Sequence, residues 1–218
     1  MILTASGGRY KMTEYQKMHN GMIYDTQDPE LGQVQKHSHR LCEQYNRLGV
    51  DDEQQKKEIL AQLFPEDDFG DYRAMETPIF IDNCREIHIG KNFYSNIHFS
   101  FIAGGTVSIG DNVFIGPYCT LATGIHSLVA KERRLTLDQN GTAHEYEYGL
   151  PITVGDDVWI ASNVTVCGGV HIGSGSVIGA GSVVTHDIPA GVLAAGNPCR
   201  VIRKITEQDS MYKKAERV

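Results

Sequence analysis

The sequence is poor in features that would indicate several common classes of protein. Its 218 residues include 20 lysines and arginines against 27 aspartates and glutamates, and the formal net charge is -7. Because there is no basic stripe to meet phosphates, nucleic-acid binding is not expected. No apolar run approaches the length of a membrane span, and the start lacks the charged-then-apolar order of a secretory signal. A globular protein that neither enters membranes nor binds nucleic acid is predicted.

Cysteine is scarce and scattered. The five residues, Cys42, Cys84, Cys119, Cys167 and Cys199, are odd in number and form no CxxC pair. This pattern favours reduced thiols in a cytoplasmic protein over a disulfide framework or a zinc site. No metal is expected, and the length allows either one sizeable domain or a domain with a smaller attachment.

The sequence has instead a strict six-residue repeat. An aliphatic residue returns at every sixth position from residue 154 to residue 184, at Val154, Ile160, Val166, Ile172, Ile178 and Val184. A second block keeps the interval at Ile109, Ile115 and Leu121, and a looser block starts at Ile89. A period of six fits neither a helix of 3.6 residues per turn nor the two-residue alternation of a strand.

The repeat fits a short strand, a corner at Gly, Asn or Asp, and another short strand. Three such units close one turn of a triangular parallel β-helix whose lead aliphatic residues stack inside. Ordinary strands with accidental spacing are the alternative, which six unbroken returns disfavour. The predicted fold class is therefore mainly β, a parallel β-helix of hexapeptide repeats over residues 78–205.

The segments that flank the repeat are expected to be helical. Residues 12–65 are interpreted as a cap on the first turn of the coil, since solenoids need their terminal repeats covered. Asp28 followed by proline is a helix start, and Gly49 is placed to end that helix. Asp51 can cap a second helix. The tail of residues 206–218 is predicted to be helical and loosely held, and the aperiodic first eleven residues to be a ragged start or an added segment.

The repeat is interrupted for some thirty residues between 122 and 153. Segments of this length without structure of their own are uncommon and are usually functional or disordered. This one contains KERR, HEYEY and a turn at Asn140-Gly141, so we expect an arm that leaves the coil and reaches over a surface. His126 stands where the arm begins. It can take a proton from an alcohol near neutral pH, or it can be a surface histidine without a task.

The chain resembles the maltose and galactoside O-acetyltransferases of the hexapeptide-repeat superfamily. The motifs that carry the resemblance are IHIGKNFYSN, SIGDNVFIGPYCTL, ITVGDDVWIASNV, IGSGSVIGAGSVVTHDIP, GNPCRVIRKI and the N-terminal MTEYQKMHNGMIYDTQDPEL. They cover nearly everything after residue 11. The resemblance implies a left-handed coil, acetyl-CoA as co-substrate, and a homotrimer with active sites between subunits. It also implies direct transfer, in a ternary complex, to a hydroxyl of a sugar or similar small polyol.

The resemblance further implies roles for single residues. His126 would be the general base. Four residues would contact the acceptor: Asn96, Asp82, Tyr94 and Asp25. Six would contact coenzyme A: Trp159, Ser162, Ala180, Thr185, Arg200 and Arg203. Taken alone, Asn96 could instead be an ordinary corner residue, Asp82 and Asp25 solvated surface acids, and Arg203 a surface arginine.

Four departures from the family pattern leave the acceptor open. His186 replaces a lysine, Ser127 replaces a proline, the turn at residues 103–105 lacks an aspartate, and LTLDQNGTA lengthens the arm. An amino-acid hydroxyl or an antibiotic is thus an alternative acceptor.

Two other classes of function are compatible with a hexapeptide coil. A zinc hydratase on the same coil needs three histidines with two close together, and the scattered histidines disfavour it. A scaffold without catalysis is the other alternative. The presence of His126, Asn96 and Trp159 together argues against that scaffold.

Overall fold

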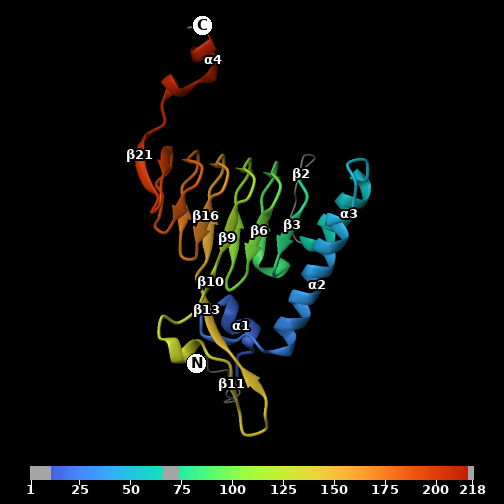
Figure 1. Cartoon of the computed structure of the whole chain (residues 1–218). Helices are drawn as coiled ribbons and strands as arrows, with labels where there is room; N and C mark the ends of the chain where they lie inside the picture. The colour runs from blue at the N-terminus through green and yellow to red at the C-terminus, as the bar shows by residue number, and fades with distance from the viewer. Residues whose placement is uncertain (1–10, 66–73, 216–218) are drawn as a thin grey trace, which may run out of the picture.

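The six-residue repeat forms a stack of short parallel strands, wound as a three-sided left-handed β-helix (Figure 1). The computed structural model describes residues 11–65 and 74–215, so almost all of the aperiodic start lies outside the described residues. The first side of the coil contains β4 (Ile87–Ile89), β7 (Val107–Ile109), β14 (Ile152–Val154) and β17 (His171–Ile172). The third side contains β3 (Ile79–Ile81), β6 (Phe99–Ile102), β9 (Thr120–Ala122), β16 (Thr165–Cys167) and β19 (Val183–Val184).

The second side is the longest. It contains β2 (Ala74–Met75), β5 (Tyr94–Ser95), β8 (Phe114–Ile115), β15 (Trp159–Ile160), β18 (Val177–Ile178), β20 (Val192–Ala195) and β21 (Arg200–Lys204). The strands run parallel except for β21, which folds back antiparallel to β20.

The core is made by the lead residues of the repeat. Ile89, Ile109, Val154 and Ile172 pair in register along the first side, and Leu121, Val166 and Val184 along the third. All six lead positions between residues 154 and 184 are at most 1% exposed. Each buried aliphatic side chain of this size contributes roughly 1.5–3 kcal/mol by leaving water. The predicted fold class is confirmed.

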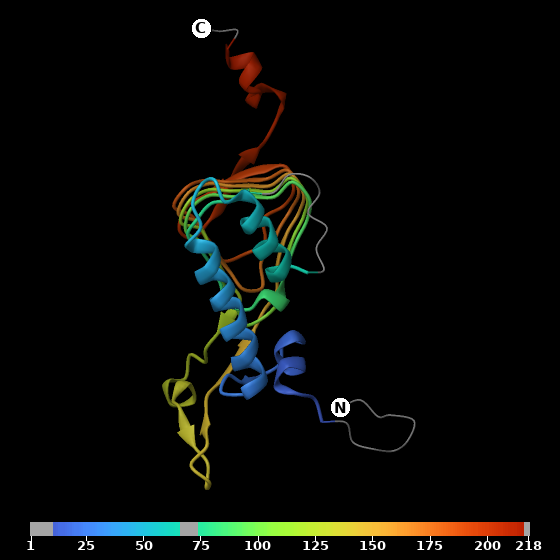
Figure 2. The ribbon, with the colours of Figure 1, turned by 90° about the vertical axis from the view of Figure 1, so that its right-hand side faces the viewer.

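Helices close the N-terminal end of the coil (Figure 2). They are α2 (Pro29–Asn46) and α3 (Glu53–Leu63), and the short 3-10 helix η1 (Cys84–Glu86) leads into β4. Helix α1 (Glu14–His19) lies below the coil, where it packs against α2 and the arm. The Asn46 side chain donates to the carbonyl of Ile79 and accepts from its N–H, both at 2.8 Å. The cap therefore pairs with β3, which begins the third side.

The helix boundaries confirm one expectation and correct two. Asp28 caps α2, since its carboxylate accepts from the N–H groups of Glu30 and Leu31. The helix ends at Asn46, however, so Gly49 does not end it. The second helix has Asp52 at its N-cap rather than Asp51. The Asp52 carboxylate accepts a hydrogen bond from the Gly49 N–H at 2.7 Å. Because this bond closes the loop between the two helices at Asp52, the second helix begins one residue later than predicted.

The interruption is an arm that hangs from the coil and pairs with the N-terminal segment (Figure 1). It contains β10 (Gly124–Ile125), η2 (Ala130–Arg133), the hairpin of β11 (Thr136–Leu137) and β12 (Ala143–His144), and β13 (Tyr146–Gly149). Strand β13 lies antiparallel between β10 and β1 (Tyr24–Asp25). The Gly141 N–H donates to Asp138, which confirms the predicted turn.

Beyond the coil the chain forms η3 (Glu207–Asp209) and α4 (Met211–Ala215), which extend away from the body (Figure 1). The helical tail is thus confirmed as far as residue 215. Among the described residues, no helix is both long enough and apolar enough to cross a membrane.

One lead position of the second side, Ser95, is polar rather than aliphatic, so its effect on the stability of the coil can be measured. Ser95 stacks between Met75 and Ile115, is fully buried, and its hydroxyl finds no hydrogen-bond partner among the described residues. Replacing Ser95 by alanine should raise the free energy of unfolding by about 1 kcal/mol, because an unsatisfied buried hydroxyl is destabilising. Urea denaturation measures this change.

Ser176 is the matched control for Ser95. It is equally buried, but its hydroxyl donates to the Pro189 carbonyl at 2.8 Å. Ser176→Ala should therefore destabilise the fold by about 1 kcal/mol. Equal losses for the two variants would show that the Ser95 hydroxyl is satisfied.

A histidine fastens the hairpin of the arm to the cap. His144 Nδ1 lies 2.5 Å from Asp25 Oδ2, and His144 Nε2 lies 3.7 Å from Asp138. The hydrogen bond to Asp25 raises the pKa of His144 above its ordinary value of 6.5. Burial opposes ionisation of Asp25, but hydrogen bonds from His144 and two backbone N–H groups leave its pKa below its ordinary value of 3.8.

The protection of the hairpin should depend on pH. The His144 contribution to the stability of the hairpin is complete below pH 6.5 and is lost as the pH rises through the raised pKa of His144. The Asp25 contribution to that stability is lost only in acid, as the pH falls through the lowered pKa of Asp25. Hydrogen exchange of residues 136–145, corrected for intrinsic rates, should be slowest at about pH 4–6 and faster above pH 7. His144→Asn should remove this dependence, and a flat profile in the wild type would contradict the contact.

Candidate functional site

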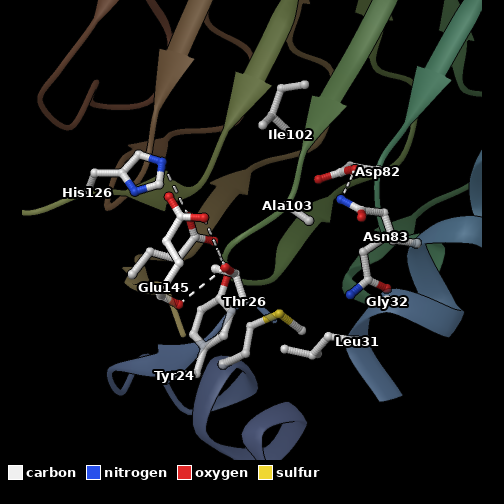
Figure 3. A pocket seen from close by; sticks show the side chains of 13 residues that line it. Tyr24, Thr26, Leu31, Gly32, Asp82, Asn83, Ile102, Ala103, His126 and Glu145 are labelled. Atoms are coloured by element: carbon white, nitrogen blue, oxygen red, sulfur yellow. Dashed lines mark hydrogen bonds and ion pairs between the residues drawn. The ribbon is translucent and has the colours of Figure 1, made fainter. Parts of the chain in front are cut away.

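A cavity of about 300 Å³ lies where the arm, the cap and the coil meet (Figure 3). The cap contributes Met18, Tyr24, Thr26, Leu31, Gly32 and Gln35, the coil Asp82, Asn83, Ile102 and Ala103, and the arm His126, Glu145 and Glu147. His126 and Asp82 project from opposite sides of this cavity. Two of the residues predicted from the sequence thus share one polar hollow.

His126 lies next to a buried carboxylate. It follows β10 directly, its side chain is half exposed, and its Nε2 lies 3.5 Å from Oε2 of Glu147. The Tyr24 hydroxyl donates to the other oxygen of Glu147, because β1 and β13 pair with Tyr24 opposite Glu147. Burial raises the pKa of Glu147 above its ordinary range. Imidazole, carboxylate and phenol therefore form one connected chain.

Glu147 was not among the residues predicted from the sequence. Its signal was the alternation in HEYEY, which places Glu145 and Glu147 on one face of a strand. Only the pairing of β13 with β1 and β10 shows that this face turns toward His126.

Asp82 is held by the cap. Its Oδ1 accepts from Gln35 Nε2 and lies within hydrogen-bond distance of His39 Nε2, both at 2.8 Å. The His39 ring rests against Phe80, with 4.9 Å between ring centroids. Two side chains of α2 thus fix the carboxylate at the wall of the cavity.

The cavity is acidic. It presents the carboxyl groups of Asp82, Glu145 and Glu147, and none of the described residues that line it is a lysine or arginine. Carboxylates accept hydrogen bonds from hydroxyl groups, whereas they repel anions. The lining suits a ligand rich in hydroxyls rather than one that carries phosphate or carboxylate.

Asp25 does not line the cavity. Its carboxylate faces the hairpin, where it contacts His144 and accepts from the N–H groups of Glu145 and Gln27. The next residue, Thr26, does line the cavity. The pairing of β1 with β13 decides this difference, because it turns neighbouring residues to opposite sides.

Gly104, in the turn at residues 103–105, has no room for a side chain. A Cβ on Gly104 would lie 2.2 Å from the Cα of Gly124, and one on Gly149 would lie 1.4 Å from the Gly104 carbonyl oxygen. Backbone packs directly on backbone where the arm leaves and rejoins the coil. An aspartate at residue 104 would therefore displace the arm, whereas Ala103 in the same turn carries its side chain at the cavity.

The other predicted residues lie along the second side of the coil and the corner that follows it. Tyr94, Phe114 and Trp159 pair in register with their side chains outward, and Trp159 is 53% exposed. Asn96, Ser162 and Ala180 belong to the corner that follows these strands. The described residues that line the His126 cavity include none of this group.

The predicted phosphate contacts lie near the C-terminal end of the coil. Thr185 Oγ1 lies 2.8 Å from His186 Nδ1, and Arg200 donates to the carbonyl of Cys199. Arg203 makes two 2.7 Å bonds to the Asp209 carboxylate. An anion at Arg203 would compete with Asp209. Within the described part of the chain, no group of three histidine, cysteine or acidic residues could hold a metal ion.

Family models match both the cap and the coil. Residues 17–67 match the maltose acetyltransferase hexapeptide capping motif. Residues 151–186 match the bacterial transferase hexapeptide with six repeats, and residues 106–126 match the hexapeptide repeat of succinyl-transferase.

Curated relatives match over most of their length. A putative acetyltransferase of Saccharomyces cerevisiae is 43% identical over 193 residues, which cover 87% of this chain and 92% of the relative. The galactoside O-acetyltransferase of Escherichia coli is 36% identical over 201 residues, which cover 92% and 93%.

Solved structures show the same architecture. A maltose O-acetyltransferase from Clostridium difficile superposes with a TM-score of 0.81 at 38% identity, covering 91% of this chain and 100% of that one. A galactoside acetyltransferase in complex with coenzyme A gives 0.80 at 35% identity, covering 91% and 94%. The chain therefore belongs to the maltose and galactoside O-acetyltransferase family of hexapeptide-repeat acyltransferases.

Proposed function

We propose that this protein moves the acetyl group of acetyl-CoA to a hydroxyl of a sugar or similar small polyol, with His126 as general base. The observation that carries the proposal is the cavity in which His126 faces Asp82 across a polar, hydroxyl-accepting lining. Family membership supplies the reaction class, since the relatives are named for O-acetyl transfer to galactosides and maltose.

The proposed reaction is a direct transfer. His126 takes the proton of the acceptor hydroxyl while the hydroxyl oxygen bonds to the thioester carbonyl carbon. Backbone N–H groups stabilise the developing oxyanion. The carbon–sulfur bond then breaks, and His126 gives the proton to the departing sulfur. Base catalysis accounts for roughly 10²–10⁴-fold of the rate, and alignment of two substrates in a ternary complex for much of the rest.

Glu147 is proposed to position His126. A carboxylate beside the ring stabilises the imidazolium that exists while His126 holds the proton. The Tyr24 hydroxyl donates to Glu147 and holds it in place. On the acceptor side, Asp82, Asn96 and Tyr94 are proposed to bind the other hydroxyls. Because the Asp25 carboxylate is bonded to His144, Asp25 would affect acceptor binding only indirectly, by holding the arm in place.

The charge of the cavity narrows the acceptor class. Three carboxyl groups without a lysine or arginine among the described lining residues disfavour sugar phosphates and sugar acids. Neutral sugars and polyols fit this lining.

Acetyl-CoA is proposed to lie along the corner that follows the second side. Trp159 offers an exposed ring face there, and Ser162 and Ala180 follow on successive turns. Thr185 and Arg200 would meet the phosphates, and Arg203 would do so on releasing Asp209. The galactoside acetyltransferase solved with coenzyme A supports coenzyme A as the co-substrate class.

A homotrimer with shared sites would unite the two groups of residues. In one chain, His126 and Asp82 line one cavity, whereas Tyr94, Asn96 and Trp159 lie along the second side and its corner. We propose that this edge of one subunit faces the His126 cavity of its neighbour. The five cysteines are free thiols, which fits the cytoplasmic location that forms part of the proposal.

The role of His126 is tested by His126→Ala. Because the proton acceptor is lost, kcat for thiol release from acetyl-CoA should fall about 10²–10⁴-fold with a galactoside or maltose as acceptor. Calorimetry should show unchanged coenzyme A binding. The control is His171→Ala, an exposed coil histidine outside the cavity, which should keep full activity. Undiminished turnover in His126→Ala would refute the mechanism.

The shared site is tested by mixing two impaired variants, His126→Ala and Trp159→Ala. If one site uses His126 and Trp159 from different chains, refolding the two together creates some wholly native sites and restores activity. Sedimentation should show a trimer throughout. Activity no higher than that of the separate variants would place both residues in the site of one chain.

A further inference from the structure

A second cavity, of about 450 Å³, opens between the helices of the cap and the first strand of the coil's first side. We call it the cap cavity. Its described lining comes from α1, α2, the end of α3, η1 and β4, and it has no described lining residue in common with the His126 cavity. A hollow of this size can hold a small organic ligand.

The charge of the cap cavity is opposite to that of the His126 cavity. The described residues that line it include Arg85 and three histidines, His19, His37 and His88, whereas none of them is an aspartate or glutamate. The chain as a whole has a net charge of -7, so this lining departs from the overall composition. An anion is attracted to such a lining, while the carboxyl groups of the His126 cavity repel it.

Two of these cationic or polar groups are available to a ligand. The Arg85 guanidinium lies 5.7 Å from the centroid of the Tyr15 ring, and its ion pair with Glu30 is 4.0 Å long between two exposed side chains. Such a pair contributes little, so the planar fork of Arg85 can still bind a carboxylate through two parallel hydrogen bonds. The His37 ring makes no hydrogen bond or ion pair with another residue in the described part of the chain.

The rest of the lining is largely apolar and aromatic. Phe64, Cys84 and Ile87 are buried, none of them more than 8% exposed, and each has part of its surface at the cavity. The rings of Tyr15 and His19, one turn apart on α1, are stacked with 6.4 Å between their centroids. An inorganic anion would leave this apolar surface in contact with water, whereas a flat ring would cover it.

A buried carboxylate holds the α1 side of the cavity in place. Glu86 is fully buried, accepts a hydrogen bond from the Thr106 hydroxyl at 2.7 Å, and lies 3.3 Å from Nδ1 of His19. Burial and a hydrogen bond to Glu86 raise the pKa of Tyr15. Both aromatic side chains of α1 are therefore positioned before a ligand arrives, and the charge of Glu86 is already compensated.

We propose that the cap cavity is a binding site for a small aromatic carboxylate, separate from the site of acetyl transfer. Arg85 binds the carboxylate, with His37 beside it, and the ring of the ligand packs on Phe64 and Ile87. The charge and the ring are both required, because the lining offers one set of contacts for each. The inference does not depend on the proposed function, since the two cavities have separate described linings.

The test is a ligand-observed NMR titration of the full chain with three probes. Benzoate, which has both the ring and the charge, should bind with a Kd on the order of 1 mM, as expected for so small a ligand. Benzyl alcohol lacks the charge and acetate lacks the ring. Each should bind at least about tenfold more weakly than benzoate, because each loses one set of contacts.

Three variants locate the site. Arg85→Gln should weaken benzoate binding about tenfold, and Glu30→Gln, which removes the competing carboxylate, should strengthen it several-fold. The matched control is Arg47→Gln, because Arg47 is also an exposed arginine of the cap, pairs with Glu43 at 3.7 Å, and lies outside the described lining of the cavity. It should leave the Kd unchanged, and all three variants should melt close to the wild type, since these side chains are exposed.

Three outcomes would overturn the proposal. They are the absence of benzoate binding to the wild type, an affinity for acetate or benzyl alcohol equal to that for benzoate, and an Arg85→Gln titration that matches that of Arg47→Gln. Thiol release plays no part in the measurement, so the result is independent of whether the protein transfers acetyl groups.

Discussion

The structure depends on one constraint, the stacking of an aliphatic side chain every sixth residue inside a three-sided coil. Because the arm leaves the coil and rejoins it in register, Ile109 lies under Val154 and Leu121 under Val166, and the backbone hydrogen bonds continue from turn to turn. The same regularity aligns corner residues into columns. Side chains at corners, such as Asn96 and Ser162, are held by a stiff frame without belonging to the core. Corner side chains can therefore vary without disturbing the buried stack of aliphatic residues.

The arm breaks this regularity between residues 122 and 153, and close backbone packing makes the break possible. Gly104, Gly124 and Gly149 let the outgoing and returning chains pass without side chains between them. Strand β13 can then pair with both β10 and β1. That small sheet brings Tyr24 from the cap and Glu147 from the arm next to His126 at the edge of the coil. His126 and its neighbouring carboxyl group thus come from the two ends of the arm, and the rest of the cavity wall comes from the cap and the coil.

The electrostatics of the site follow from the same arrangement. The cap contributes neutral residues such as Gln35 and Thr26, while coil and arm contribute the carboxyl groups. The arginines Arg200 and Arg203 lie instead near the far end of the coil. The two ends of the proposed path therefore differ in charge, the acidic end suiting hydroxyls and the basic end suiting phosphates. This separation supports an acceptor at the arm and a nucleotide at the C-terminal turns.

The sequence by itself determined the coil, its core and the place of the interruption, because period and residue type are local properties that no distant contact overrides. It also singled out His126, Asp82 and Trp159 through the family motifs. Tertiary structure decided what depends on strand pairing across long separations. It turned Asp25 toward His144 and Thr26 into the cavity, and it placed Glu147 beside His126. It also placed Arg85 and His37 at one cavity of the cap. The alternation in HEYEY marks one face of a strand but not its neighbour, because each of these contacts joins residues from different segments whose relative position only the closed fold sets.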